Sequence, residues 1–113
     1  QRIAFCEQQG MDRRRLLVDP GIGFGKTTQH NLTLLQRSRV WRGLGLPWLL
    51  GVSRKQIVGA LTGESDPHRR DVGSHVLGIL VDADILRVHD VAGARQALAV
   101  ATGFTQAPLE AAA

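Results

Sequence analysis

Cysteine and long apolar runs are scarce in this sequence, and both shortages exclude classes of protein. Cys6 is the single cysteine among 113 residues, so neither an intrachain disulfide framework nor a cysteine-based zinc site is expected. The longest apolar runs, such as 49–52 and 77–81, are far shorter than the roughly 20 residues that a membrane span needs. No N-terminal stretch has the pattern of a signal peptide. We therefore expect no membrane partner and a cytoplasmic location, and the length allows one domain at most.

Lysine and aromatic residues are also few. Twelve of the fourteen basic residues are arginine, and the net charge is +4. A basic balance can indicate a nucleic-acid partner. However, most of the arginines stand singly, and the aromatic residues, 4% of the chain, do not alternate with them to form a stacking surface for bases. We therefore expect no nucleic-acid partner.

The sequence does have a regular alternation of short apolar runs and helical periodicity. We expect helices over 2–9, 31–40, 55–61, 68–81 and 91–102, strands over 16–18, 48–52 and 85–88, and a frayed tail over 105–113. Unbroken apolar strands between helices predict an α/β fold with a parallel sheet. A closed (β/α)8 TIM barrel has eight strands in about 250 residues. The chain is therefore predicted to form, over 1–104, the C-terminal portion of such a barrel, about three β/α units.

Each expected strand ends in a polar cluster. The clusters are Asp19-Pro20-Gly21, Ser53-Arg54-Lys55 and Arg87-Val88-His89-Asp90. The carboxyl ends of parallel strands share one edge of the sheet, and ligands bind at that edge. The sequence therefore predicts one binding site built from all three clusters.

The glycine-rich segment 21–28 is similar to a P-loop but differs from it in spacing. Three residues separate Gly21 from Gly25-Lys26-Thr27, where a P-loop has four. We therefore expect this segment not to bind ATP or GTP. Two interpretations remain, a mobile turn or a loop whose backbone approaches a flat ligand closely.

The first two clusters each have a structural and a functional interpretation. Asp19 can cap its own turn, or it can accept paired N–H donors from a ligand. Ser53 can be the N-cap of the next helix. The neighbouring cations Arg54 and Lys55 are opposed by the helix dipole at that position, which favours a ligand site.

The third cluster predicts an anion site. Arg87 and His89 alternate with Val88, so both side chains project to the same side of the strand. An arginine and a histidine side by side suit a phosphate or pyrophosphate. The alternative is a structural ion pair of Arg87 with Asp19 or Asp90.

The remaining histidines and the tryptophans have simpler expectations. His30, His68 and His75 lack metal-ligand spacing, so we expect surface or helix positions for them and no metal site in this chain. Trp41 and Trp48 flank a loop and are expected to pack in the interior.

Three segments together resemble successive motifs of the dihydropteroate synthase family. They are DPGIGFGK at 19–26, GVSRK at 51–55 and RVHDV at 87–91. Their order and approximate spacing agree with the family, and the resemblance extends from about Gln1 to Phe104. It implies a (β/α)8 barrel, a transferase of folate biosynthesis and a target of sulfonamides. Such an enzyme joins p-aminobenzoate to 6-hydroxymethyl-7,8-dihydropterin pyrophosphate, giving 7,8-dihydropteroate and pyrophosphate.

The resemblance also implies roles for individual residues. Asp19 would bind the amino-pyrimidine edge of the pterin, and the Gly23 backbone would line the pterin pocket. Three residues would be catalytic: Lys55 contacts the pterin ring and positions the amine, while Arg87 and His89 hold the pyrophosphate. Arg87 could also stack on the pterin.

A second group of residues would surround p-aminobenzoate. Phe24 and the segment Ser53-Arg54-Lys55 would border its pocket. Its carboxylate would face the helix N-terminus near Gln56, a position at which the family often has serine.

The family further implies partners, a cofactor and an incomplete site. Mg²⁺ would assist the leaving pyrophosphate, with its ligand expected outside these residues. A homodimer would form through the helices at 68–81 and 91–102. We expect the chain alone to be inactive, and measurable dihydropteroate formation by it would refute this.

Two alternatives remain open. One is a methyltetrahydrofolate-type pterin-binding methyltransferase, testable with a corrinoid methyl acceptor. The other is a non-catalytic homologue or interaction subunit.

Overall fold

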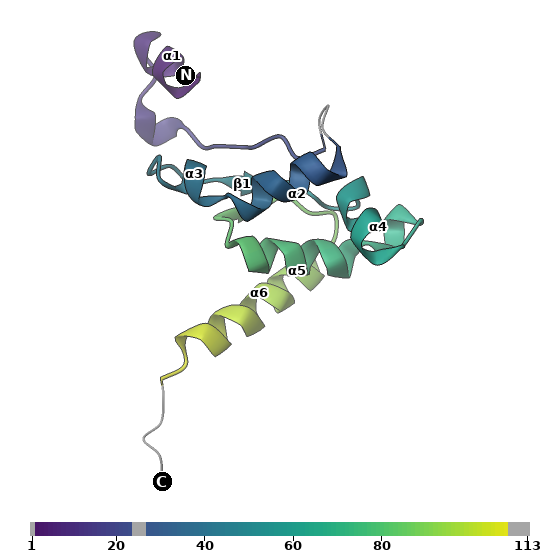
Figure 1. Cartoon of the computed structure of the whole chain (residues 1–113). Helices are drawn as coiled ribbons and strands as arrows, with labels where there is room; N and C mark the ends of the chain where they lie inside the picture. Colours follow the sequence, from purple (N-terminus) through teal and green to yellow (C-terminus); the bar gives the residue numbers. More distant parts are fainter. Residues whose placement is uncertain (1, 24–26, 109–113) are drawn as a thin grey trace.

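The computed structural model describes residues 2–23 and 27–108, and it is a mixed α/β arrangement with few strands (Figure 1). Phe24, predicted to border a substrate pocket, lies outside the described residues. In chain order the elements are α1 (Arg2–Gln8), η1 (Arg13–Arg15), α2 (Thr28–Gln36), α3 (Arg39–Arg42), β1 (Leu49–Leu50), α4 (Gln56–Thr62), η2 (Pro67–Arg69), α5 (Asp71–Val81), β2 (Ile85–Leu86) and α6 (Val91–Gln106).

The parallel pairing of the strands is confirmed, but the strands are shorter than predicted. Leu49 lies opposite Ile85, and Leu50 lies opposite Leu86, in a parallel pair. The predicted strand at 16–18 is present as a single parallel bridge from Val18 to Trp48. Within the described residues, Val18 pairs only with Trp48, and β2 pairs only with β1. These two outer segments therefore have a neighbour on one side only. Leu17, in the middle of this apolar run, is accordingly 50% exposed.

The core surrounds β1. Trp48, Leu50 and Val52 alternate along this stretch and are each at most 3% exposed, as expected for side chains on one face of a strand. They pack with Trp41 from α3 and with buried residues of α2 and α4. The two tryptophan rings meet edge to face, with centroids 5.4 Å apart. Their predicted packing role is confirmed.

Two predicted helices have different bounds in the structure. The helix expected at 31–40 begins at Thr28, because the Thr27 hydroxyl accepts a hydrogen bond from the His30 N–H at 3.1 Å. It ends at Gln36, and α3 follows as a separate turn. The helix expected at 68–81 is divided at Arg70 into η2 and α5.

The helices at the two ends of the chain differ in how they pack. In Figure 1, α1 lies apart from the other α-helices, and it has no buried residue. By contrast, α5 and α6 lie against each other, and α6 continues to Gln106, four residues past the predicted end. None of the described helices is long and apolar enough to cross a membrane.

Candidate functional site

A cavity lies at the carboxyl ends of β1 and β2. Its volume is about 150 Å³, and its lining is Gly51, Ser53, Lys55, Arg87, Val88 and His89. Two of the three predicted polar clusters therefore meet in one hollow. The third cluster is adjacent, since Asp19 Oδ2 lies 3.9 Å from Arg87 Nη1. The prediction that the clusters share one edge is confirmed.

Lys55 connects this cavity to the glycine-rich loop. Its Nζ donates a hydrogen bond to the Ile22 carbonyl at 2.6 Å. A methyl group on Gly23, whose φ is +88°, would lie 3.1 Å from Lys55 Cδ. Glycine therefore provides both the left-handed backbone and the room for the lysine stem.

Asn31 supports the same loop and was not predicted from the sequence. Its Oδ1 accepts a hydrogen bond from the Gly23 N–H at 3.2 Å, and the residue is 4% exposed. A polar residue in the first turns of a helix carries no sequence signal that separates this role from a solvated one. The contact fixes α2 against the loop that carries Gly23.

Asp19 combines the two roles that the sequence left open. Its Oδ1 accepts from the Gly21 N–H at 2.8 Å, which is a turn-capping bond. Its Oδ2 points toward Arg87 at 3.9 Å, and the two side chains are 37% and 55% exposed. An exposed pair at this distance contributes little stability. One carboxylate oxygen therefore holds the turn while the other faces the site.

Ser53 binds His89 and is not a helix cap. The Ser53 Oγ accepts the His89 backbone N–H at 3.1 Å and lies 2.7 Å from Nδ1 of the same residue. The hydroxyl proton needs an acceptor because Ser53 is 8% exposed, and Nδ1 is the acceptor that the described residues give it. A His89 ring that accepts the Ser53 hydroxyl proton at Nδ1 carries its own proton on Nε2. The N-cap interpretation of Ser53 was wrong, since Lys55 occupies the N-cap of α4.

Arg54 is turned away from the cavity. Its Nε and Nη2 donate to the two carboxylate oxygens of Asp71 at 3.0 and 3.2 Å. These bonds hold the pKa of Asp71 below its ordinary value and raise the pKa of Arg54. Arg54 has a φ of +62°, a left-handed conformation that costs a non-glycine residue about 1–2 kcal/mol.

The other predicted residues lie outside the cavity. Gln56 is exposed at the start of α4. His30 and His68 are exposed, and His75 is 5% exposed on α5. Within 2–23 and 27–108, no group of three histidine, cysteine, aspartate or glutamate residues could hold a metal ion.

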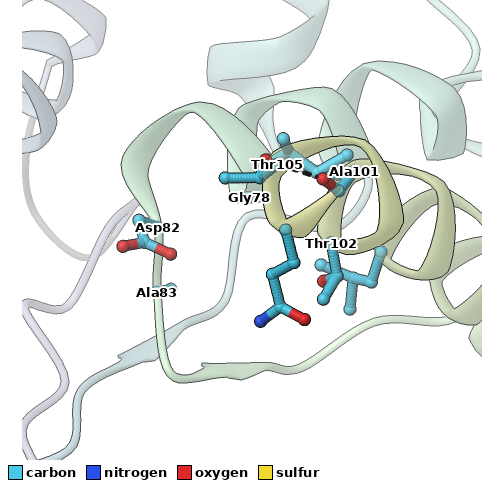
Figure 2. A pocket seen from close by; sticks show the side chains of 9 residues that line it. Gly78, Asp82, Ala83, Ala101, Thr102 and Thr105 are labelled. Atoms are coloured by element: carbon cyan, nitrogen blue, oxygen red, sulfur yellow. Dashed lines mark hydrogen bonds between the residues drawn. The ribbon is translucent and has the colours of Figure 1, made fainter. Parts of the chain in front are cut away.

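A larger hollow of about 230 Å³ lies elsewhere, between the end of α5 and α6 (Figure 2). It is lined by Gly78, Ile79, Asp82, Ala83, Leu98, Ala101, Thr102, Thr105 and Gln106. Asp82 is the single charged residue of this lining, so the hollow is unsuited to an anion. The cavity with Lys55, Arg87 and His89 is the better candidate for a phosphorylated ligand.

Comparison with known proteins agrees with the motifs. Residues 1–89 match the family described as pterin binding enzyme. Dihydropteroate synthase of Escherichia coli K12 is 40% identical over 102 residues, which are 88% of this chain and 36% of that protein. The chain thus spans about a third of the length of the curated relatives it matches.

Solved structures give the same result. Dihydropteroate synthase from Xanthomonas albilineans in complex with 7,8-dihydropteroate is 44% identical, with a TM-score of 0.91 over 95% of this chain and 42% of that one. The enzyme from Stenotrophomonas maltophilia is 42% identical, with a TM-score of 0.91 over 96% of this chain and 42% of that one. From its motifs, its site and these matches, the chain belongs to the pterin binding enzyme family.

Proposed function

We propose that this chain forms the C-terminal portion, about three β/α units, of the TIM barrel of a dihydropteroate synthase. Its match to 42% of the Xanthomonas albilineans enzyme supports this placement. The relatives named above are dihydropteroate synthases, which favours this activity over the methyltransferase and the non-catalytic alternatives. The reaction would join p-aminobenzoate to 6-hydroxymethyl-7,8-dihydropterin pyrophosphate, releasing pyrophosphate.

The observation that carries this proposal is the convergence of Lys55, Arg87 and His89 on one cavity. Displacing pyrophosphate from a methylene carbon requires stabilisation of the negative charge that develops on the leaving group. The Arg87 guanidinium and the His89 Nε2–H are donors suited to phosphate oxygens. Lys55 would contact the pterin and orient the attacking amine. The reaction needs no covalent nucleophile from the protein.

The two organic substrates would lie on either side of Lys55. Asp19 and the Gly23 backbone would bind the pterin. Ser53, Phe24 and Gln56 would border p-aminobenzoate, a ligand of the Xanthomonas albilineans enzyme in a solved structure. Since the Arg54 side chain is bound to Asp71, we propose that Arg54 borders this pocket through its backbone.

The cofactor, location and oligomer remain proposals as well. Mg²⁺ would assist pyrophosphate departure, and we place its ligands outside the described residues because these contain no suitable cluster. We propose a cytoplasmic homodimer that forms through α5 and α6. Apolar side chains exposed on these helices support it, among them Val72, Leu80 and Val100 at 76%, 75% and 69%.

Calorimetric titration with inorganic pyrophosphate tests the anion site in this chain. The chain should bind pyrophosphate, and Arg87→Ala should weaken binding about tenfold or more, because a charge-assisted hydrogen bond is lost. Arg42→Ala is the matched control, since Arg42 is also an exposed arginine paired with an aspartate, Asp82. Equal affinities for the two variants would contradict the assignment of Arg87.

A further inference from the structure

The segment 53–55 presents alternate side chains to the cavity. Ser53 and Lys55 line it, whereas Arg54 between them is directed at α5. The left-handed backbone at Arg54, with φ +62°, produces this turn. A non-glycine residue keeps such a conformation only where its surroundings fix it. The contacts of Arg54 therefore determine where its two neighbours point.

Arg54 is held at its N–H, its carbonyl and its side chain. The N–H donates to Ser74 Oγ at 3.3 Å, and the carbonyl accepts from Arg70 Nη1 at 3.1 Å. The guanidinium binds both carboxylate oxygens of Asp71 at 3.0 and 3.2 Å. All three partners lie within five residues of one another, at the start of α5.

Arg70 is itself fixed by burial and by further bonds. It is 7% exposed, and its guanidinium also donates to the Glu64 and Ser65 carbonyls at 2.9 and 3.3 Å. A methyl group on Gly59 would lie 2.6 Å from Arg70 Cζ, so the guanidinium packs directly on α4. A buried arginine with carbonyl partners is costly to place, and here it joins α4, the loop after it and Arg54.

We propose that Arg70, Asp71 and Ser74, named here the Arg54 clamp, are positioning residues for the cavity. They hold Arg54 in its left-handed conformation, which directs Ser53 to His89 and Lys55 to the Ile22 carbonyl. None of the three lines the cavity, so they act through Arg54. The part of this inference that concerns ligand binding rests on the proposed function.

Amide hydrogen exchange measured by NMR tests the clamp without any ligand. The Arg54 and Lys55 amides have defined acceptors, Ser74 Oγ and the Val52 carbonyl. Asp71→Asn should accelerate exchange at both amides about tenfold, the loss expected for one charge-assisted pair. The sheet amides of Leu49 and Arg87, bound to the Val18 and Leu50 carbonyls, should be unchanged.

Two further variants separate positioning from general stability. Asp82→Asn removes an exposed partner of Arg42 at the other end of α5 and should change none of the four amides. Arg54→Lys keeps the charge but loses the bidentate geometry, so it should reproduce Asp71→Asn. Unchanged Arg54 and Lys55 amides, or equal acceleration at all four, would overturn the clamp.

Pyrophosphate titration supplies the functional readout. Asp71→Asn should weaken pyrophosphate binding several-fold, whereas Asp82→Asn should not. Local acceleration of exchange with unchanged affinity would overturn the positioning of the cavity. If the unaltered chain binds no pyrophosphate, the proposed function fails, while the exchange data still decide the clamp.

Discussion

Replacing Gly51, which directly follows β1, by alanine tests whether the Arg87 guanidinium needs a residue without a side chain at this position. A methyl group at this position would lie 2.9 Å from Arg87 Cζ and 3.0 Å from Nε. Ordinary carbon contacts begin near 3.5 Å, so the guanidinium has to retreat by at least about 0.5 Å. Because the Arg87 side chain is 55% exposed, it can move into solvent, away from the cavity.

The expected result is a loss of binding with little loss of stability. Pyrophosphate affinity should fall about tenfold, because one charge-assisted hydrogen bond is misplaced. The free energy of unfolding should change by less than about 1 kcal/mol, since alanine also restricts the unfolded chain. Calorimetry measures the affinity. Urea unfolding followed by tryptophan fluorescence measures the stability, because Trp41 and Trp48 are 8% and 1% exposed.

Gly43→Ala is the matched control for this variant. Its new methyl group would lie 3.5 Å from the Arg39 carbonyl oxygen and 3.8 Å from that of Val40, which are ordinary contacts. Gly43 ends α3 and does not line the cavity. If Gly51→Ala binds pyrophosphate as tightly as Gly43→Ala, the space beside Gly51 is not needed for Arg87 to bind the anion.

Three further predictions concern the site and its support. Ser53→Ala should weaken pyrophosphate binding about threefold to tenfold, because His89 loses the hydroxyl that contacts both its backbone N–H and its ring Nδ1; a titration with unchanged affinity would contradict this. The Asp71 pKa is lowered by folding, so its stabilising contribution should be complete above about pH 5 and lost as the pH falls below 4. Urea midpoints of the chain and of Asp71→Asn should therefore converge in acid, and a constant difference would be the contrary result. Gly78→Ala would place a methyl group 2.7 Å from both terminal methyl carbons of Leu86 in β2, and should destabilise the chain by about 1–3 kcal/mol in urea unfolding. Gly103→Ala, with open space around it, should instead be neutral or stabilising by up to ~1 kcal/mol.

The sequence predicted which residues gather at the site better than it predicted which way they point. Parallel strands bring their carboxyl ends to one edge, so Ser53, Lys55, Arg87 and His89 could be placed together from order alone. The direction of Arg54 could not. It depends on a left-handed residue and on Asp71, a partner 17 residues away that no periodicity connects to it.

The extent of the strands and helices was also only partly predictable. Apolar runs located the strands, but pairing needs a neighbour, and at Val18 the described chain supplies a single bridge. The break before α5 has a cause that lies in tertiary contacts. The Arg70 guanidinium donates hydrogen bonds to the carbonyls of Arg54 and Glu64. The helical periodicity over 68–81 does not reveal these contacts.

We propose that Lys55, Arg87 and His89 are catalytic residues of a dihydropteroate synthase, and a chimeric enzyme is the sharpest test of this proposal. This chain would replace the matching 102-residue part of the Escherichia coli enzyme, to which it is 40% identical. Dihydropteroate formation from p-aminobenzoate and the pterin pyrophosphate would then be measured. We predict an active chimera whose rate falls at least about a hundredfold with Lys55→Ala, because the attacking amine loses the group that orients it. A chimera that folds with both tryptophans buried but forms no dihydropteroate, or that keeps its rate in Lys55→Ala, would show that these residues do not have the proposed roles.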